Sequence, residues 1–276
     1  MACVLALGLF ATVAFGASPR RADESPRGYY LALGDSLTYG FQLAKANAVL
    51  PPSGFHSGFV DVFAARLRAR APKIKVVNYG CPGESTITFT RGGCPWLAAK
   101  RPLHNAFQGS QMSAALAFLR SHRGLVSPIT LTLGGNDANA LSEACHESLA
   151  CVRARAPGAT AAFASRLGSI LHQLRRAAPH AEIIVTGGWN EDVDHLAQTN
   201  PLWQALNLAT KKAAAASSAR FADMLPVFNP RGSAAKEKAR ICALTFVCSQ
   251  GDGHPTDAGY KAMAAAVLAA SSLTHR

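Results

Sequence analysis

Short apolar segments alternate with longer segments of helical periodicity along most of this chain. The apolar segments are typical of buried strands, and they are Tyr29–Leu33, Ile74–Asn78, Ile129–Leu133, Glu182–Thr186 and Phe221–Val227. The helical segments are Phe59–Arg70, Ser110–His122, Ala159–Ala178, Pro201–Ser217 and Thr256–Ala270. Strands separated by helices of this length predict a parallel sheet covered by helices on both faces. The predicted fold class is therefore α/β: a single domain of three layers, α/β/α, with a mainly parallel sheet of about five strands.

Several residues with useful chemistry follow the predicted strands. Ser36, Gly83, Asn136 and Trp189 each come shortly after one of these segments. In open sheets of parallel strands, ligand sites collect at the carboxyl ends of the strands. We therefore expect these four residues to lie along one rim of the sheet.

Four short stretches combine into one chemical pattern. In chain order they are Gly34-Asp35-Ser36-Leu37, Asn78 through Gly83-Glu84-Ser85, Gly134-Gly135-Asn136-Asp137 and Asp252-Gly253-His254-Pro255. Together they supply a hydroxyl nucleophile, a general base and neutral hydrogen-bond donors, which are the parts of a serine hydrolase site. Each stretch alone is weak evidence, and an isolated serine such as Ser36 is also a common helix N-cap. Their joint order favours catalysis.

The first stretch resembles block I of the GDSL, or SGNH, hydrolases, and the resemblance runs from Tyr29 to Leu268. It implies a flavodoxin-like SGNH hydrolase fold. It also implies an oxyanion hole made by the N–H groups of Ser36 and Gly83 and by the side-chain amide of Asn136. Such fixed neutral donors stabilise the negative charge of a tetrahedral intermediate.

Two assignments within this pattern have alternatives. Gly83 fits the second block best because acidic and hydroxyl residues follow it, and Gly80 is the competing choice. Asn136 resembles the asparagine of the third block, and the alternative is a turn asparagine in left-handed geometry. We expect Gly83 and Asn136 to serve the site.

His254 is the predicted general base, by analogy with the Ser-His-Asp arrangement. The family's last block usually has its aspartate three residues before the histidine, but that position is Gly251 here and the aspartate is Asp252. Residues two apart in an extended segment project to the same side, so Asp252 can reach the Nδ1–H of His254. We favour Asp252. The alternative is the carbonyl of Gly251, which would leave a Ser–His dyad.

Other acidic residues near these stretches are interpreted as structural. Asp35 and Asp137 are expected to organise their loops. The segment Asp192-Val193-Asp194-His195 superficially resembles a metal cluster, but its ligands are crowded in sequence and no partner stretch is evident. We expect a solvated loop there, and neither a metal nor a cofactor.

Aromatic residues in the rim loops are candidates for an apolar acyl groove. The predicted substrate-binding residues are Tyr39, Phe41, Trp96 and Trp189, with Leu43, Phe89 and Asn190 as further candidates. The alternative is ordinary packing beneath long loops, because aromatic residues are mostly buried.

Six cysteines predict disulfides: Cys81, Cys94, Cys145, Cys151, Cys242 and Cys248. Six cysteines allow 15 pairings, and sequence proximity suggests joining each to its neighbour in that order. Free thiols are the weaker alternative, and zinc is weaker still because no pair has Cys-x-x-Cys spacing. Disulfides are typical of exported proteins, so we expect the protein to be secreted, outside the cell or in its envelope.

The amino-terminal segment agrees with export. Residues 2–15 form an apolar run that is short for a bilayer span, and small residues follow it at Gly16-Ala17-Ser18. We expect residues 1–17 to be a cleaved signal peptide, 18–27 a linker and 28–276 the catalytic domain, and a retained membrane anchor is the alternative. No positive segment precedes the run, so the signal is expected to start upstream of Met1.

The chain carries a formal net charge of +12. Such a charge attracts anionic envelopes and lipid surfaces, so peripheral contact with them is one expectation. A soluble surface encoded by an arginine-rich genome is the favoured explanation. No basic stripe interleaved with aromatic residues is present, which argues against nucleic acid as a partner. We expect a monomer.

These observations predict a secreted serine esterase or lipase that hydrolyses carboxylic esters, including lipid esters, through an acyl-enzyme on Ser36. A carbohydrate O-deacetylase would use the same residues. From a different class, a non-catalytic envelope-binding protein of the same fold is the other alternative.

Overall fold

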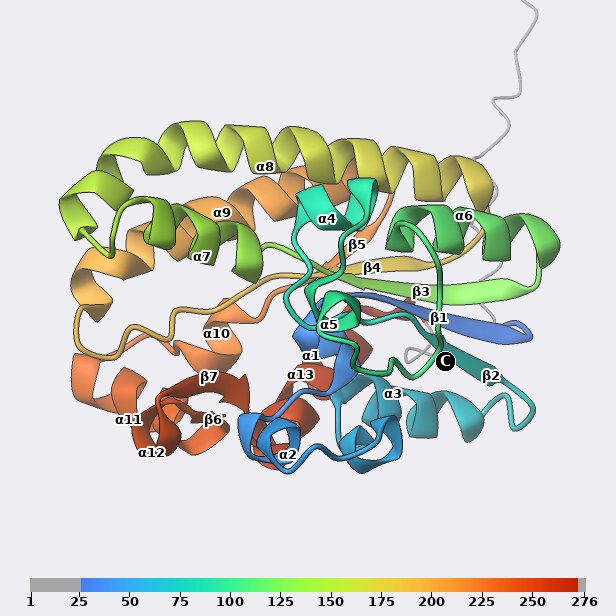
Figure 1. Ribbon diagram of the computed structural model, residues 1–276, viewed down its shortest axis with the longest axis horizontal. Helices are drawn as coiled ribbons and strands as arrows, with labels where there is room; N and C mark the ends of the chain where they lie inside the picture. The colour runs from blue at the N-terminus through green and yellow to red at the C-terminus, as the bar shows by residue number, and fades with distance from the viewer. Residues whose placement is uncertain (1–25, 273–276) are drawn as a thin grey trace, which may run out of the picture.

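The computed structural model describes residues 26–272 and contains a central sheet of five parallel strands (Figure 1). The strands are β1 (Tyr29–Gly34), β2 (Lys75–Asn78), β3 (Val126–Thr132), β4 (Ile183–Thr186) and β5 (Arg220–Ala222). Their order is β2-β1-β3-β4-β5. After β1 the chain forms β2 at one edge of the sheet, and then crosses back to form β3, β4 and β5 on the opposite side of β1. Ligand sites of such sheets lie where the direction of winding reverses, here between β1 and β3. The predicted α/β fold is confirmed, while the expected signal peptide, residues 1–17, lies outside the described residues.

Helices cover both faces of the sheet, because successive side chains of each strand point to opposite faces. Tyr30 and Ala32 pack with helices α3 (Phe59–Arg68) and α13 (Asp257–Ala270). Leu31 and Leu33 pack on the other face, with α6 (Gln111–Ser121), α8 (Leu149–Ala177) and α9 (Leu196–Ala216). Figure 1 shows these as separate layers above and below the strands. Burial of this apolar surface is the main stabilising contribution to the fold.

Shorter elements connect the layers, and several of them lie at the carboxyl ends of the strands. They are α1 (Ser36–Tyr39), α2 (Leu43–Asn47), η1 (Pro52–Phe55), α4 (Thr86–Arg91), α5 (Pro95–Ala98), α7 (Gly135–Ala144), α10 (Leu225–Phe228), α11 (Ala234–Leu244) and α12 (Val247–Gln250). An antiparallel ribbon of β6 (Thr245–Phe246) and β7 (Asp252–Pro255) stands apart from the main sheet. The sequence did not predict this ribbon, which carries His254.

The fifth strand is shorter than the predicted segment Phe221–Val227. It ends at Ala222, because the Asp223 carboxylate accepts a hydrogen bond from the N–H of Leu225 and helix α10 begins there. Pro226 lies in the first turn of that helix, a position that suits proline. Helices α8 and α9 also start earlier than predicted, and each continues through a proline, Pro157 or Pro201.

Three disulfides join the cysteines that are neighbours in sequence: Cys81–Cys94, Cys145–Cys151 and Cys242–Cys248. These are the pairings that sequence proximity suggested. The first closes the loop between β2 and α5, and the third connects α11 to α12 beside the β6–β7 ribbon. Over residues 26–272, no helix combines the length and apolar character needed to cross a membrane.

Candidate active site

Ser36 is positioned by a sharp turn at the end of β1. Gly34 has φ of +131°, and a Cβ atom there would overlap the backbone of Thr132, so this position requires glycine. Asp35 caps α1 by accepting a hydrogen bond from the N–H of Leu37 at 3.0 Å. Ser36 is therefore the first residue of α1, at the carboxyl rim of the sheet.

His254 faces Ser36 from the β6–β7 ribbon. Its Nε2 lies 2.8 Å from the Ser36 hydroxyl oxygen, and its Nδ1 lies 2.5 Å from Oδ1 of Asp252. The other carboxylate oxygen of Asp252 accepts the backbone N–H of Leu43 at 3.2 Å. The Ser36 hydroxyl, the His254 ring and the Asp252 carboxylate are thus connected by successive hydrogen bonds. Between the two partners left open by the sequence, the ring meets the Asp252 carboxylate and not the Gly251 carbonyl.

The environment of Asp252 keeps its carboxylate ionised. Burial alone would raise its pKa, but hydrogen bonds from the His254 ring and from the backbone N–H groups of His254 and Leu43 outweigh burial. The pKa of Asp252 consequently lies below its ordinary value. A fixed anion at this position orients the ring so that Nε2 points to the serine.

Gly83 and Gly80 differ in how their N–H groups are used. The N–H of Gly80 donates to the Asn78 side chain at 2.8 Å. In the described chain, the N–H of Gly83 donates to no protein group, and Gly83 lines the cavity with Ser36. Gly83 also has φ of +87° and packs against Pro95, which leaves little room for a side chain. The geometry thus favours Gly83 over Gly80 as the residue whose backbone N–H is available to a ligand in the cavity.

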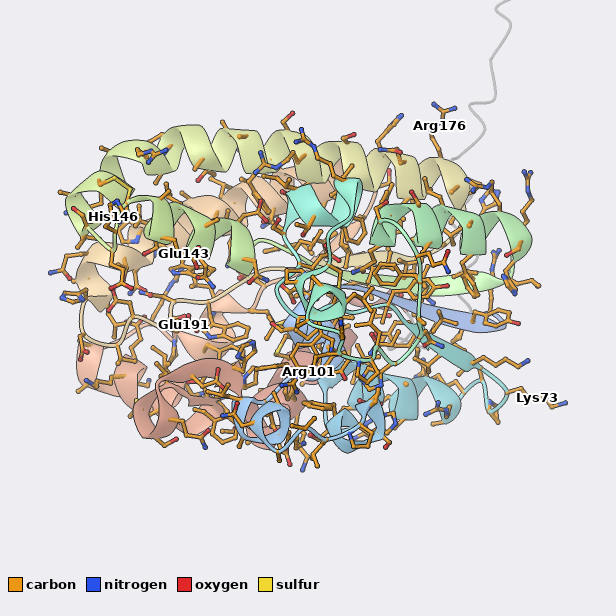
Figure 2. All side chains as sticks on the ribbon, in the orientation of Figure 1. Lys73, Arg101, Glu143, His146, Arg176 and Glu191 are labelled. Carbon is orange, nitrogen blue, oxygen red and sulfur yellow. A yellow bond between two sulfur atoms is a disulfide. The ribbon has the colours of Figure 1, made fainter. Side chains whose placement is uncertain are left out.

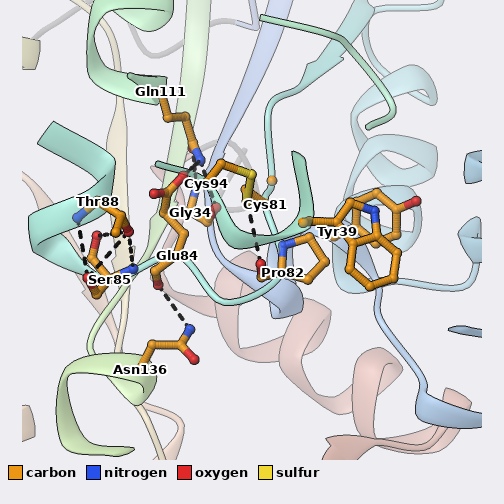
Figure 3. Close-up of a disulfide and its surroundings, with 12 residues drawn as sticks. Gly34, Tyr39, Cys81, Pro82, Glu84, Ser85, Thr88, Cys94, Gln111 and Asn136 are labelled. Carbon is orange, nitrogen blue, oxygen red and sulfur yellow. Dashed lines mark hydrogen bonds between the residues drawn. A yellow bond between two sulfur atoms is a disulfide. The ribbon is translucent and has the colours of Figure 1, made fainter. Parts of the chain in front are cut away.

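Asn136 reaches the same cavity from the start of α7. Its side-chain Nδ2 donates to the carbonyl of Glu84 at 2.9 Å, as Figure 3 shows. An asparagine amide carries two N–H donors, so this bond holds the group in place and leaves one donor for the cavity. Asn136 and Gly83 both line that cavity.

Gln111, which the sequence analysis missed, ties the first two motifs together (Figure 3). Its amide nitrogen donates to the Gly34 carbonyl at 2.9 Å and to Glu84 Oε2 at 3.0 Å, and its oxygen accepts the N–H of Gly34. Burial raises the pKa of Glu84. Gln111 therefore fixes the end of β1 relative to the second loop. The only sequence signal is its place after Ser110, the cap of α6.

The two aspartates interpreted as structural do organise loops. Asp137 accepts hydrogen bonds from the backbone N–H of Thr86 at 2.9 Å and from Arg166 at 3.1 Å. It thereby joins the α4, α7 and α8 regions. Asp35 is almost completely buried, and burial raises its pKa to about 7.

A cavity of about 530 Å³ opens beside Ser36 and His254. Of the predicted substrate-binding residues, Phe41, Trp96 and Trp189 line it, and Tyr39 does not. Tyr39 is 1% exposed, and its hydroxyl donates to the Pro102 carbonyl because the loop after α5 closes over the ring. Tyr39 therefore lies beneath this loop and not in the lining of the cavity.

The further groove candidates also lie outside the cavity, and other residues take their place. Phe89 is buried in the core under α6 and α8, and Asn190 is buried with Thr199 as a hydrogen-bond partner. Glu191 and Trp203 line the cavity and were missed. Trp203 could have been noticed as an aromatic residue in a predicted helix, but Glu191 gave no distinctive signal.

The side chains that could ligate a metal ion make other interactions in this structure. Among residues 26–272, the cluster with suitable spacing is Cys81, Glu84 and Cys94, and its two sulfurs are joined in a disulfide. In the segment considered as a metal cluster, Asp192 accepts hydrogen bonds from His195, and Asp194 pairs with Lys238 on the surface.

Comparison with solved structures shows the same fold in known hydrolases. The chain superposes on phospholipase A1 from Streptomyces albidoflavus (TM-score 0.58, 22% identity), covering 89% of this chain and 100% of that one. It also superposes on an extracellular lipase from Streptomyces rimosus (TM-score 0.59, 20% identity, 88% and 99% covered). A variant of an acetyl xylan esterase from Geobacillus stearothermophilus gives TM-score 0.52 at 17% identity, with 90% and 96% covered.

In sequence, no curated protein matches the chain. The model of the GDSL-like Lipase/Acylhydrolase family matches residues 32–262, a span that includes Ser36, Asn136 and His254. The resemblance stated from the motifs is thereby confirmed, and the chain belongs to the GDSL-like lipase/acylhydrolase family.

Proposed function

We propose that the protein is a serine esterase or lipase that hydrolyses carboxylic esters through an acyl-enzyme on Ser36. The observation that carries this proposal is the hydrogen-bonded line from Asp252 through His254 to Ser36. Family membership supports ester hydrolysis as the reaction class. The proposal requires no cofactor.

In the first half-reaction, His254 Nε2 takes the proton of Ser36 as the serine oxygen bonds to the ester carbonyl carbon. The electron pair of the carbonyl moves to its oxygen, and Asp252 stabilises the ring while it is positively charged. When the tetrahedral intermediate collapses, the alcohol leaves with the proton from His254. Water then repeats the sequence on the acyl-serine and releases the acid.

Three donors are suited to the charge that develops on the carbonyl oxygen. They are the N–H groups of Ser36 and Gly83 and the second N–H of the Asn136 amide. Because Asn136 is held by Glu84 and Gly83 by its loop, these donors need little rearrangement when the charge appears.

The likeness to lipases and to an acetyl xylan esterase supports esters as substrates in general and leaves the alcohol open. Lipid or short-chain esters are the first candidates, since aromatic and aliphatic side chains line much of the cavity. Acetylated sugars are the second, because tryptophans such as Trp96 and Trp203 also suit sugar rings. Three disulfides support a secreted protein, for which we infer a monomer.

The decisive experiment combines hydrolysis of p-nitrophenyl esters with active-site labelling. Ser36→Ala is expected to lower turnover about 10⁶-fold, as loss of the serine does in other serine hydrolases. A fluorophosphonate probe should form an adduct on Ser36 of the folded protein. If no adduct forms and no ester is cleaved, the non-catalytic binding protein becomes the better explanation.

A further inference from the structure

The lining of the cavity beside Ser36 differs in its ionisable residues from the chain as a whole. The whole chain contains 28 Lys and Arg against 16 Asp and Glu. The cavity lining nevertheless includes three carboxyl side chains, Asp35, Glu191 and Asp252, and within the described chain no lysine or arginine lines it. Burial raises the pKa of Asp35 to about 7, so the negative charge of this lining comes from Asp252 and from Glu191 when it is ionised. With no basic residue beside them, these two groups suit cationic substrates better than anionic ones.

The same cavity collects the tryptophans. The chain has three, Trp96, Trp189 and Trp203, and all of them line this cavity. Trp189 is held by stacking on Phe228, with ring centroids 4.0 Å apart. Trp96 packs edge-on against Phe41 at 5.6 Å, and the Arg101 guanidinium already lies over its ring, 5.1 Å from the centroid. Trp189 and Trp203 are therefore the rings considered for a ligand cation. Tryptophan faces attract cations more strongly than other aromatic rings do.

Glu191 differs from the other two carboxyl groups in having no donor. Asp252 accepts hydrogen bonds from His254 and Leu43, and Asp35 accepts one from Leu37. The Glu191 carboxylate accepts none from residues 26–272. Glu191 is half-buried and lines the cavity, so its carboxylate is available to a ligand that supplies positive charge.

The position of Glu191 places its carboxylate next to the reacting groups. It lies on the loop between β4 and α9, marked in Figure 2, and a Cβ atom at Gly253 would overlap its Oε2. Gly253 separates Asp252 from His254 in sequence. Burial raises the pKa of Glu191, the nearby carboxylates Asp252 and Asp192 raise it further, and His254 opposes them. A bound cation would favour the ionised form.

We propose that Glu191, Trp189 and Trp203 select esters whose alcohol part carries a quaternary ammonium group. This inference rests on the proposed esterase function and names its substrate class. A quaternary ammonium has no N–H to donate, so ring faces and one carboxylate match it better than a set of hydrogen-bond acceptors would. In the reaction, the ester C–O bond breaks, the acyl group passes to Ser36, and the cationic alcohol leaves with the proton from His254.

The test compares two substrates that differ only in charge. One is butyrylcholine. The other is its neutral isostere, a butyric ester whose alcohol part ends in a tert-butyl group, because carbon replaces the quaternary nitrogen. For the unmodified protein, kcat/KM for the choline ester is expected to exceed that for the isostere about tenfold, within the range of a cation–aromatic contact.

Two variants test the assigned residues, and one serves as a control. Glu191→Gln should bring the ratio of the two kcat/KM values to near one. Trp203→Leu should also lower it, which keeps the test open if the first variant misfolds. The control is Asp194→Asn, because Asp194 lies on the same loop but pairs with Lys238 on the surface. It should leave the ratio unchanged.

The outcomes separate this inference from the proposed function. Equal kcat/KM for the two esters, or a ratio that persists in both Glu191→Gln and Trp203→Leu, would overturn the inference and leave the esterase intact. Faster cleavage of an acetylated xylose than of either ester would also overturn it. Failure to cleave any ester, including p-nitrophenyl butyrate, would contradict the esterase proposal itself.

Discussion

The molecule has a cavity of similar size at each end of its central sheet. The cavity at the carboxyl ends of the strands measures about 530 Å³ and includes three carboxyl groups. The cavity at the amino ends measures about 590 Å³, and no Asp or Glu lines it within residues 26–272. Its basic side chains are Arg27, Arg120, His122, Arg123, Arg176 and His180. The volumes are close, and the chemistry is opposite.

Helix direction explains part of this difference. In a parallel α/β fold the connecting helices run against the strands, so their carboxyl ends lie at the amino ends of the strands. Arg120 and Arg176 lie in the last turns of α6 and α8, where the helix dipole favours cations. Asp137 and Asp257 lie in the first turns of α7 and α13, where it favours anions. Figure 2 shows Arg176 toward the amino ends of the strands and Glu191 toward their carboxyl ends.

The dipole does not explain everything at the carboxyl end. Glu191 lies on a loop, outside the first turn of any described helix. Asp252 lies on a strand and is oriented by hydrogen bonds from a histidine and a loop. The comparison thus separates charges that stabilise helices from charges that serve a site. Variants at the two ends should therefore behave differently.

The largest expected effect is on turnover. Asp252→Ala should lower kcat on p-nitrophenyl butyrate about 10⁴-fold, because the His254 ring loses the anion that orients it. Arg123→Ala, at the other cavity, is the control and should have near-native kcat. A loss below tenfold for Asp252→Ala would instead point to the Gly251 carbonyl as the partner of the ring.

The next effect concerns stability at alkaline pH. The folded pKa of Asp35 is raised to about 7, so the folded state binds its proton more tightly than the unfolded state does. Its contribution to stability is therefore full below the ordinary pKa and is lost as the pH rises through about 7. Asp35→Asn removes this loss and should stabilise the protein at pH 8 by up to about 4 kcal/mol, counting about 1.4 kcal/mol per pKa unit.

Thermal unfolding of the two proteins at pH 5 and pH 8 measures this difference. The advantage of Asp35→Asn should grow with pH. An advantage that is the same at both values would show that Asp35 is not held in its protonated form by burial.

A third variant probes the proposed oxyanion donors. Asn136→Ala should lower kcat about 100–1000-fold, the usual result of losing one such donor. Circular dichroism should show normal folding, since Asn136 makes one side-chain hydrogen bond, to the Glu84 carbonyl, among the described residues. A near-native rate would remove Asn136 from the site and favour the turn asparagine.

The smallest effect is expected at the basic end. Arg120→Ala removes a cation from the last turn of α6 and should lower the free energy of unfolding by about 0.3–1 kcal/mol, with unchanged kcat. Measuring chemical unfolding in low and high salt checks the cause, because salt screens such interactions. An equal loss in both salts would argue against the helix dipole.

The fold was largely predictable because it rests on local patterns. The centre of β3, for example, is a run of apolar and β-branched residues that stands out in the sequence from Ile129, although the strand itself begins three residues earlier, at Val126. The β6–β7 ribbon was missed because its strands are two and four residues long and carry no alternating pattern. The end of the fifth strand was misjudged because Asp223 and Pro226 start a helix there.

The positions of candidate site residues were predictable where a motif stands at the end of a strand, as at Ser36 and Asn136. It was not predictable where a contact joins distant segments. Gln111 meets Gly34 across 77 residues, and nothing near Gln111 in sequence indicates that meeting. The burial of Tyr39 could not be foreseen for a related reason, since it depends on the loop that carries Pro102.

The Ser36 hydroxyl and the His254 ring lie 218 residues apart along the chain. A ribosome makes the first of them early and the second only near the end, and chains fold progressively as they are made. A half-synthesised or truncated polypeptide therefore holds the nucleophile without its base. Assembly of the Ser36–His254 pair therefore requires the chain to be synthesised as far as His254.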